Sequence, residues 1–423
     1  MDVPQEWFSL DNAAKLYPAI EDRNRPSVFR VSVKLNEPVD PVLLEQAARR
    51  VLTRFPGFQV RLVTGVFWYY FERNTRDLQI EPDGPPYCRR ILHRDPSKYM
   101  FRIRYSREDI ALEVFHAVTD GAGALVFLKT LAAHYLSLVH PDLDIPPEQG
   151  VLDLNEEPQP EELEDSYSRY YDSHPRRPKT EPRVFHMKGG NLEYGQLKLT
   201  IGRIPLNSIM GECKRRGVTV TEYLSAIYLY ALYWVQFKKG GRQRSVRISV
   251  PVNLRRLYAS RTLRNFTRFI KPGIDPYLGE YSFEEVLHQV HHYMRYEIND
   301  KYLREEFSTN VHMERHMLMR IMPVAVKNRM ISFMFNHYGE NHYSGTLSNL
   351  GKVSIPKEME PFINQFHFIL GANRINKNSC TVLSYGDILT LTFARTIEET
   401  KLEEYFFSFL VEQGIPVSVA ARG

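Results

Sequence analysis

The order of strand-like and helix-like segments is the feature that most constrains how this chain can fold. Residues 98–105 and 109–116 alternate apolar and polar side chains, and a long apolar stretch follows at 122–138. Alternation with a period of two indicates strands, whereas a longer apolar stretch indicates a buried helix. The same order of strand, turn, strand, tight loop and helix recurs at 380–413. We therefore predict an internal duplication that yields two similar α/β lobes.

Further segments complete this division of the chain. Between Pro141 and Pro182 there are eight prolines, many acidic residues and almost no apolar periodicity. We predict an N-terminal lobe at 1–140, a Pro/acid-rich linker or crossover loop at 141–190, and a C-terminal lobe at 191–423 that carries a degenerate copy of the first lobe's loop. The other strands are predicted at 27–35, 58–63, 66–72, 194–202, 244–252, 343–349 and 365–371, and the other helices at 41–52, 220–237 and 282–299.

The composition excludes several classes of protein. Hydrophobic residues make up 43% of the 423 residues, which is enough for two packed cores. The net charge of +5 is small for this length and does not indicate nucleic-acid binding. The three cysteines are far apart in the sequence, which suits a reducing compartment. No signal peptide and no membrane span are expected from the sequence, so we predict a cytoplasmic protein.

The stretch FHAVTDG at 115–121 is the strongest candidate for a functional site. A His and an Asp at the spacing of His116 and Asp120 would occur roughly 0.6 times by chance in this composition, and His140 with Asp144 is such a pair in a proline-rich loop. Requiring a glycine next, as Gly121 provides, lowers the chance count to about 0.03. The alternative is a histidine of the core that is hydrogen-bonded to a neighbour.

The chemistry of these residue types fits their predicted positions. His116 ends a strand, so its backbone is held rigidly, and an imidazole can take a proton from a hydroxyl or an amine near neutral pH. Asp120 lies beyond a tight turn and is better placed to fix that turn through an ion pair than to touch a substrate. Gly121 is expected to relieve a strained backbone at the turn.

FHAVTDG resembles the HHxxxDG signature of the chloramphenicol acetyltransferase-like superfamily, which includes condensation domains, wax ester synthases and bacterial alcohol acetyltransferase-like proteins. The chain resembles the last group most. Residues 250–255, VPVNLR, are similar to the PVNLR segment of condensation and wax ester enzymes. Residues 346–351, TLSNLG, resemble the strand segment that faces the catalytic histidine. The resemblance extends over nearly the whole chain.

The resemblance implies two lobes arranged as a V-shaped pseudo-dimer, each a mixed, mostly antiparallel sheet with flanking helices, and a tunnel between them. His116 would act as general base, and the acceptor would attack an acyl thioester without a covalent acyl-enzyme. A hydroxyl or amide on the facing strand would stabilise the oxyanion, with Ser348 the first choice, Thr346 the second, and Asn349 a further contact to the substrate. The alternative is that these three are ordinary polar residues of a strand.

Two positions depart from the superfamily pattern, and the second concerns the support of Asp120. Phe115 replaces the first histidine of the signature, which many relatives also lack. Gln59 stands where condensation domains supply the arginine that pairs with the motif aspartate. Arg61, on the same strand face as Gln59, and Arg255 are the two candidates for that role.

Other signals are given less weight. The histidines at 288, 291, 292, 312 and 316 lack a carboxylate or cysteine to complete a set, so we predict no metal site. The basic residues Arg255, Arg256, Arg261, Arg264 and Arg268 could face the phosphates of coenzyme A, but a solvated or structural face is the alternative.

We predict an O- or N-acyltransferase without a tightly bound cofactor, whose donor is acyl-CoA or a phosphopantetheine thioester and whose acceptor is a small alcohol or amine. An acyl carrier protein is a further expected partner, and nucleic acid is not. Two alternatives stay open: a free-standing condensation-type protein that uses carrier-bound acyl groups, and a non-catalytic binding scaffold with the same fold.

Overall fold

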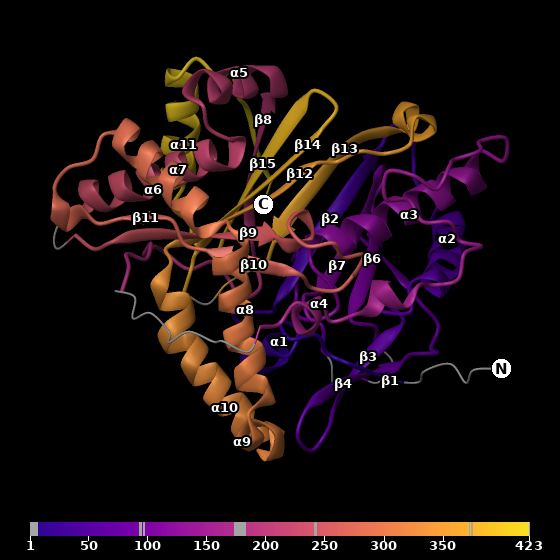
Figure 1. Cartoon of the computed structure of the whole chain (residues 1–423). Helices are drawn as coiled ribbons and strands as arrows, with labels where there is room; N and C mark the ends of the chain where they lie inside the picture. Colours follow the sequence, from indigo (N-terminus) through magenta and orange to yellow (C-terminus); the bar gives the residue numbers. More distant parts are fainter. Residues whose placement is uncertain are drawn as a thin grey trace.

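The computed structural model describes residues 7–92, 95, 98–172, 183–240, 243–371, 373 and 375–422, which form two lobes side by side (Figure 1). The N-terminal lobe is built on a five-stranded sheet with the order β13-β2-β7-β6-β5. Its strands are β2 (Val28–Leu35), β5 (Ile80–Pro82), β6 (Phe101–Tyr105), β7 (Asp109–Phe115) and β13 (Ile363–Leu370). The helices α2 (Pro41–Arg54) and α3 (Gly121–Val139) pack on each other and share one apolar core with this sheet.

The C-terminal lobe is built on an eight-stranded sheet with its own core. Its path is β10-β9-β12-β14-β15-β8-β16, and β11 also pairs with β9. The strands are β8 (Lys198–Pro205), β9 (Val246–Asn253), β10 (Thr267–Ile270), β11 (Gly273–Ile274), β12 (Gly345–Lys352), β14 (Asn378–Tyr385), β15 (Ile388–Arg395) and β16 (Ser418–Arg422). The helices are α5 (Leu206–Arg216), α6 (Val220–Lys239), α7 (Phe283–Glu297) and α11 (Lys401–Glu412).

The predicted fold class is confirmed. Most strand pairs are antiparallel, and β12 runs parallel to both β9 and β14, so the sheets are mixed. The order β6, β7, α3 in the first lobe matches β14, β15, α11 in the second, as the repeated pattern predicted. At the start of α6, Thr219 and Glu222 form the capping box that their spacing indicated.

One strand joins a different lobe from the one that its position in the sequence predicted. Strand β13 lies within the predicted C-terminal lobe at 191–423, yet it pairs with β2 and adds an edge to the N-terminal sheet. Phe366 and Phe368 of β13 are buried in the N-terminal core. The boundary predicted from composition therefore assigns this strand to the wrong lobe, because an alternating pattern does not specify the sheet a strand joins.

The predicted linker at 141–190 is a folded strap where the structure describes it; its residues 173–182 lie outside the described part of the chain. It contains two short elements, η1 (Pro160–Leu163) and α4 (Ser166–Arg169). Glu162 receives two hydrogen bonds from Arg54 of the N-terminal lobe at 2.7 and 2.8 Å. The amide of Leu263 in the C-terminal lobe donates to the carbonyl of Glu162 at 2.9 Å. The strap thus joins the two lobes.

A small sheet, β1-β4-β3, combines two predicted strands with one that was not predicted. The strands predicted at 58–63 and 66–72 are β3 (Val60–Thr64) and β4 (Tyr69–Arg73), whereas β1 (Trp7–Ser9) and the helices that follow here were not predicted. Helix α1 (Leu16–Ile20) follows β1, and α8 (Asp300–Arg315), α9 (Met317–Ile321) and α10 (Val324–Met334) extend to the lower end of the molecule in Figure 1. By length and composition alone α3 could cross a membrane, but 67% of its most apolar stretch is buried inside the protein, as in a core helix.

Candidate active site

His116 follows the last residue of β7 and is held from several directions. Its backbone amide donates to the carbonyl of Ser27 at 2.8 Å, which fixes the turn out of the strand. The imidazole stacks on the ring of Tyr17 in α1, with centroids 4.5 Å apart and planes 15° apart. The ring of Phe29 in β2 contacts it edge-on at 4.9 Å. Burial lowers the pKa of His116 below its ordinary value of 6.5, so the ring is neutral at pH 7.

A buried hydrogen-bonded chain reaches the imidazole from the C-terminal lobe. The Nδ1 atom of His116 lies 3.0 Å from the side-chain oxygen of Asn265. The side-chain amide of Asn265 donates to the carboxylate of Asp11 at 3.2 Å. Asp11 also lies 3.6 Å from the guanidinium of Arg264 and accepts from the amide of Ala14 at 2.7 Å. Asp11 and Asn265 are both fully buried, so this chain is held away from solvent.

The direction of these hydrogen bonds fixes which nitrogen of the imidazole carries the proton. An ionised carboxylate only accepts hydrogen bonds, so Asn265 presents its NH₂ group to Asp11 and its oxygen to His116. The Nδ1 atom of the neutral ring therefore carries the proton, and Nε2 keeps a lone pair. Burial raises the pKa of Asp11 to about 6, against the attraction of Arg264, so Asp11 is ionised at neutral pH. His116 is thereby prepared to accept a proton at Nε2.

Asp120 performs two structural tasks with its two oxygens. Its Oδ1 atom accepts from the amides of Ala122 and Gly123, at 3.1 and 3.2 Å, and so caps the N-terminus of α3. Its Oδ2 atom accepts from the guanidinium of Arg255 at 2.8 Å and from the amide of Phe266 at 2.9 Å, both in the C-terminal lobe. These contacts make Asp120 a positioning residue.

Of the two candidate partners for Asp120, the structure selects Arg255. Arg255 also donates to the carbonyl of Thr262 at 2.8 Å and to that of Arg264, so it shapes the loop that carries Asn265. Arg61 lies on β3 and forms an ion pair with Glu72 on the neighbouring strand β4. The prediction that Arg61 could support the motif is therefore wrong, because β3 belongs to the separate three-stranded sheet.

Gly121 is required for a reason other than the predicted one. Its backbone does not adopt the left-handed conformation that only glycine tolerates well. Instead, a Cβ atom at this position would lie 2.6 Å from a methyl group of Leu350 on β12. At Gly123, a Cβ atom would lie 2.2 Å from the carbonyl oxygen of Leu263. The glycines therefore permit close approach between the start of α3 and the C-terminal lobe.

The structure places the three predicted oxyanion residues on β12, beside the start of α3. Leu347 packs into the C-terminal core, whereas Leu350 contacts the N-terminal core and Gly121. Since successive strand residues face opposite ways, Ser348 and Thr346 point away from the C-terminal core. The side chain of Asn349 is already engaged in two hydrogen bonds. It donates to the hydroxyl of Thr221 in α6 at 3.0 Å and accepts from the amide of Gly351 at 2.8 Å. Ser348 and Thr346 stay candidates for contact with an oxyanion.

Most of the predicted basic run is engaged in structural contacts. Besides Arg255, Arg264 donates to the carbonyl of Ser9 at 2.6 Å, and Arg268 forms an ion pair with Glu306 of α8. Arg256 and Arg261 are exposed. A structural face is thus the better description of three of these five arginines. Among the discounted histidines, His291 lies 3.3 Å from Glu222 of the α6 capping box.

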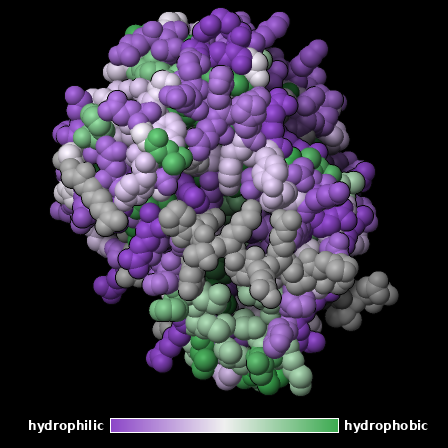
Figure 2. Space-filling view, turned by 60° about the vertical axis from the view of Figure 1, so that its left-hand side comes forward, coloured by the Kyte–Doolittle hydropathy of each residue, from purple (hydrophilic) through white to green (hydrophobic). Residues whose placement is uncertain are grey.

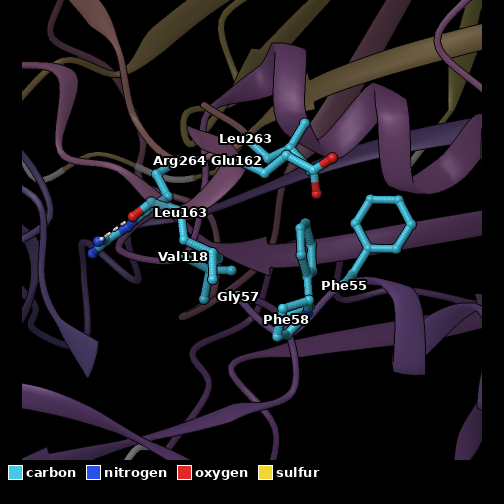
Figure 3. Close-up of a pocket in the computed structure, with 9 residues that line it drawn as sticks. Phe55, Gly57, Phe58, Val118, Glu162, Leu163, Leu263 and Arg264 are labelled. Atoms are coloured by element: carbon cyan, nitrogen blue, oxygen red, sulfur yellow. Dashed lines mark hydrogen bonds between the residues drawn. The ribbon is translucent and has the colours of Figure 1, made fainter. Parts of the chain in front are cut away.

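A small cavity lies directly behind the motif loop, and Figure 3 shows its lining. Phe55 and Phe58 form one wall together with Val118, two residues after His116, and Leu163 and Leu263 close it from the strap and the C-terminal lobe. It has room for about one water molecule. The cavity therefore marks where the two lobes and the strap meet and is too small for a substrate.

The residues that orient His116 were missed by the sequence analysis. Asn265 and Asp11 are 254 positions apart, and neither lies in a periodic segment or a motif. Asp11 looks like an ordinary turn residue, since it accepts a hydrogen bond from Ala14 three positions later. The only local signal was the nearness of Asn265 to the PVNLR segment, whose arginine contacts the same loop.

The orienting role of Asn265 gives the first prediction. Asn265→Ala is expected to lower kcat about 100-fold with little change in KM, because a slightly misplaced base costs that much. The hydrogen bond that His116 donates to the side-chain oxygen of Asn265 raises the pKa of His116, so in the variant the acid limb of the pH profile should move to lower pH. Steady-state kinetics across pH would measure both effects. Asn74→Ala is the control, since Asn74 is a buried asparagine of the N-terminal lobe; an equal loss of kcat in both variants would contradict the orienting role.

Comparison with solved structures shows which proteins share this fold. Trichothecene 15-O-acetyltransferase from Fusarium sporotrichioides matches with a TM-score of 0.61 and 13% identity, over 96% of this chain and 97% of that one. The starter condensation domain of rhizomide synthetase, a mutant in complex with C8-CoA, matches with a TM-score of 0.58 and 12% identity, over 96% and 94%. The wax ester synthase/diacylglycerol acyltransferase from Marinobacter aquaeolei VT8 matches with a TM-score of 0.56 and 14% identity, over 96% and 100%. This chain thus shares its fold with two acyltransferases and a condensation domain, as the resemblance seen in the sequence implied.

A family model narrows this class for part of the chain. The model of the alcohol acetyltransferase family matches residues 190–382, which include the PVNLR segment, Asn265 and β12. No curated protein matches the chain in a sequence comparison. Within the superfamily fold, the C-terminal lobe is therefore similar to alcohol acetyltransferases.

Proposed function

We propose that this protein transfers an acyl group from a thioester to the hydroxyl of an alcohol, or to an amine, with His116 as general base. The observation that carries the proposal is the chain from Asp11 through Asn265 to Nδ1 of His116, which leaves Nε2 free to accept a proton. The fold shared with acyltransferases and the match to the alcohol acetyltransferase family support the reaction class.

The proposed reaction proceeds in two steps, addition of the acceptor to the thioester and loss of the thiol. Nε2 of His116 takes the proton from the acceptor hydroxyl as the acceptor oxygen bonds to the carbonyl carbon of the thioester. The resulting oxyanion is stabilised by a hydroxyl of β12, for which Ser348 is the first candidate and Thr346 the second. The carbon–sulfur bond then breaks, and the thiolate leaves with the proton that His116 had taken. Asp120 and Arg255 hold the loops that position these groups.

Acyl-CoA is the proposed donor. Arg256 and Arg261 are exposed near the strap and the site loop, where they could contact phosphate groups. A condensation-type reaction would use the same groups with a carrier-bound phosphopantetheine thioester. We propose a cytoplasmic location as well, because all three cysteines are free and buried.

A thiol-release assay tests this proposal. The wild-type protein is incubated with acetyl-, octanoyl- and palmitoyl-CoA, each with and without primary alcohols or primary amines. We expect release of free CoA that depends on both the protein and an acceptor, together with the matching ester or amide in mass spectrometry. A carrier-protein donor in a parallel arm separates the condensation-type alternative. Absence of acceptor-dependent thiol release with every donor would favour the non-catalytic scaffold.

A further inference from the structure

The lower end of the molecule exposes an unusual concentration of large apolar side chains, which we call the apolar tip. Figure 2 shows this end as a largely hydrophobic surface. Met317 is 74% exposed, and Leu318, Ile321 and Phe333 are each more than half exposed. The other members are Val66, Phe67, Met313, Val326 and Met334. Monomeric proteins seldom present so many contiguous apolar side chains without a partner.

The apolar tip is built from two parts of the chain that support each other. The turn between β3 and β4 contributes Val66 and Phe67, and α9 and α10 contribute most of the rest. The amide of Val324 donates to the carbonyl of Val66 at 2.8 Å, and Lys327 donates to the carbonyl of Phe67 at 2.8 Å. Helix α9 has no buried residue at all. Hydrogen bonds therefore fix the backbone of the apolar tip, while its apolar side chains stay exposed and do not pack into the core.

The charge of this segment has a single sign. Between Arg315 and Met334 there are four basic residues and no Asp or Glu. Three of them, Arg315, Arg320 and Arg329, are exposed, whereas Lys327 is buried between the two parts of the tip. The nearest acidic residue before the segment, Glu314, already pairs with Lys15 and accepts from Asn12 at 2.7 Å. The tip therefore combines exposed apolar side chains with three exposed arginines.

We propose that the apolar tip docks the protein onto an anionic lipid surface. Apolar side chains on short helices enter the boundary between headgroups and acyl chains, while nearby arginines contact anionic headgroups. A second copy of the chain fits the tip less well, because a symmetric contact would bring the arginines of both copies together without acids to compensate. The tip is also an end of the molecule rather than a broad face (Figure 1).

Docking at this tip would bring the candidate active site close to the lipid surface. Helix α10 packs against α1, the helix whose Tyr17 stacks on His116. Just beyond α10, Asn336 accepts two hydrogen bonds from Arg25 at 3.2 Å, and Arg25 in turn donates to the carbonyl of Ile20 at the end of α1.

Vesicle co-sedimentation of the full chain tests the proposal. The probes are vesicles of phosphatidylcholine alone and of an equimolar mixture of phosphatidylcholine and phosphatidylserine. We expect the wild-type protein to sediment with the mixed vesicles, to bind the neutral vesicles at least about tenfold more weakly, and to be released by high salt. Leu318→Ser with Ile321→Ser is expected to lower binding to the mixed vesicles more than tenfold, since two apolar side chains that would enter the lipid are replaced by polar ones. Arg320→Glu with Arg329→Glu should abolish the preference for phosphatidylserine.

Two control substitutions sit on other surfaces of the protein. Leu278→Ser removes an apolar side chain that is 81% exposed in the C-terminal lobe, and Arg203→Glu reverses an exposed charge on β8; both should bind vesicles like the wild type. The proposal is overturned if the wild type does not bind the mixed vesicles, or if the control variants lose as much binding as the tip variants. It is equally overturned if the tip variants change only self-association, measured by sedimentation velocity, or only capture of an acidic carrier protein.

Discussion

Replacing His116 with alanine is expected to lower kcat/KM for acyl transfer by about 10²–10⁴-fold, the usual contribution of a positioned general base. The imidazole stacks on Tyr17 without filling a core position, and its removal leaves the hydrogen bond between Asn265 and Asp11 in place. The fold should therefore persist, and loss of activity can be assigned to loss of the base. Thiol release in the presence of the best acceptor would measure the effect.

The pH dependence of the same reaction provides a second check. The base is active in its neutral form, so the rate is complete above the pKa of His116 and is lost as the pH falls through it. Because burial lowers this pKa below 6.5, the wild type should keep its activity to a lower pH than an ordinary histidine would allow. Asp11, with its pKa raised to about 6, becomes protonated in the same range and weakens the fixed tautomer. His116→Ala should lose this acid limb.

The chain contains a matched control for His116. His140 stands four residues before Asp144, the same spacing as in the motif, but it pairs with Glu37 at 2.9 Å on the surface. His140→Ala should leave kcat/KM within about twofold of the wild type, as is usual for surface changes away from a site. If the two histidine variants behaved alike, or if His116→Ala kept more than about a tenth of the activity, a general-base role would be excluded.

The sequence was sufficient to predict the fold wherever the apolar pattern had a clear period. β7 and α3 appear at the residues that alternation and the long apolar stretch indicated, and the capping box at Thr219 marks the start of α6. By contrast, α9 and α10 were not predicted, because neither helix buries an apolar residue and so neither has an apolar stripe. Helix α8 was missed although Leu303, Phe307 and Val311 form a buried stripe at helical spacing. The sheet that β13 joins could not be predicted from the sequence, because sheet membership depends on tertiary contacts.

The site shows a similar division between local and distant information. His116 was found because a motif in the right local setting is rarely produced by chance. The choice between Arg61 and Arg255 needed the structure, because it depends on which sheet each arginine joins. Asn265 and Asp11 could not be found, since their contact brings together residues from opposite lobes and no local pattern records it. These two residues were missed because they lie far apart in the sequence, not because their chemistry is unusual.

Substituting Asp120 is expected to have the largest effect on stability. The side chains of Asp120 and Arg255 are 2% and 14% exposed, so their ion pair is shielded from water. Removing one partner of a buried pair typically costs about 3–5 kcal/mol, because the other charge is left without compensation. Asp120→Ala also removes the cap of α3, worth about 1 kcal/mol. The free energy of unfolding, measured by urea titration with tryptophan fluorescence, should therefore fall by about 4 kcal/mol or more.

Two further variants separate the cap from the bridge between lobes. Asp40 caps α2 through the amides of Val42 and Leu43 but lies on the surface, so Asp40→Ala should cost only about 1 kcal/mol. Asp120→Asn keeps an oxygen for the cap but removes the charge opposite Arg255, and it should still cost about 3 kcal/mol. Adding Arg255→Met to Asp120→Asn should recover part of that loss, because no unpaired charge is then left buried. If Asp120→Ala cost no more than Asp40→Ala, Asp120 would be a helix cap alone, and the ion pair would not hold the lobes or the loop of Asn265.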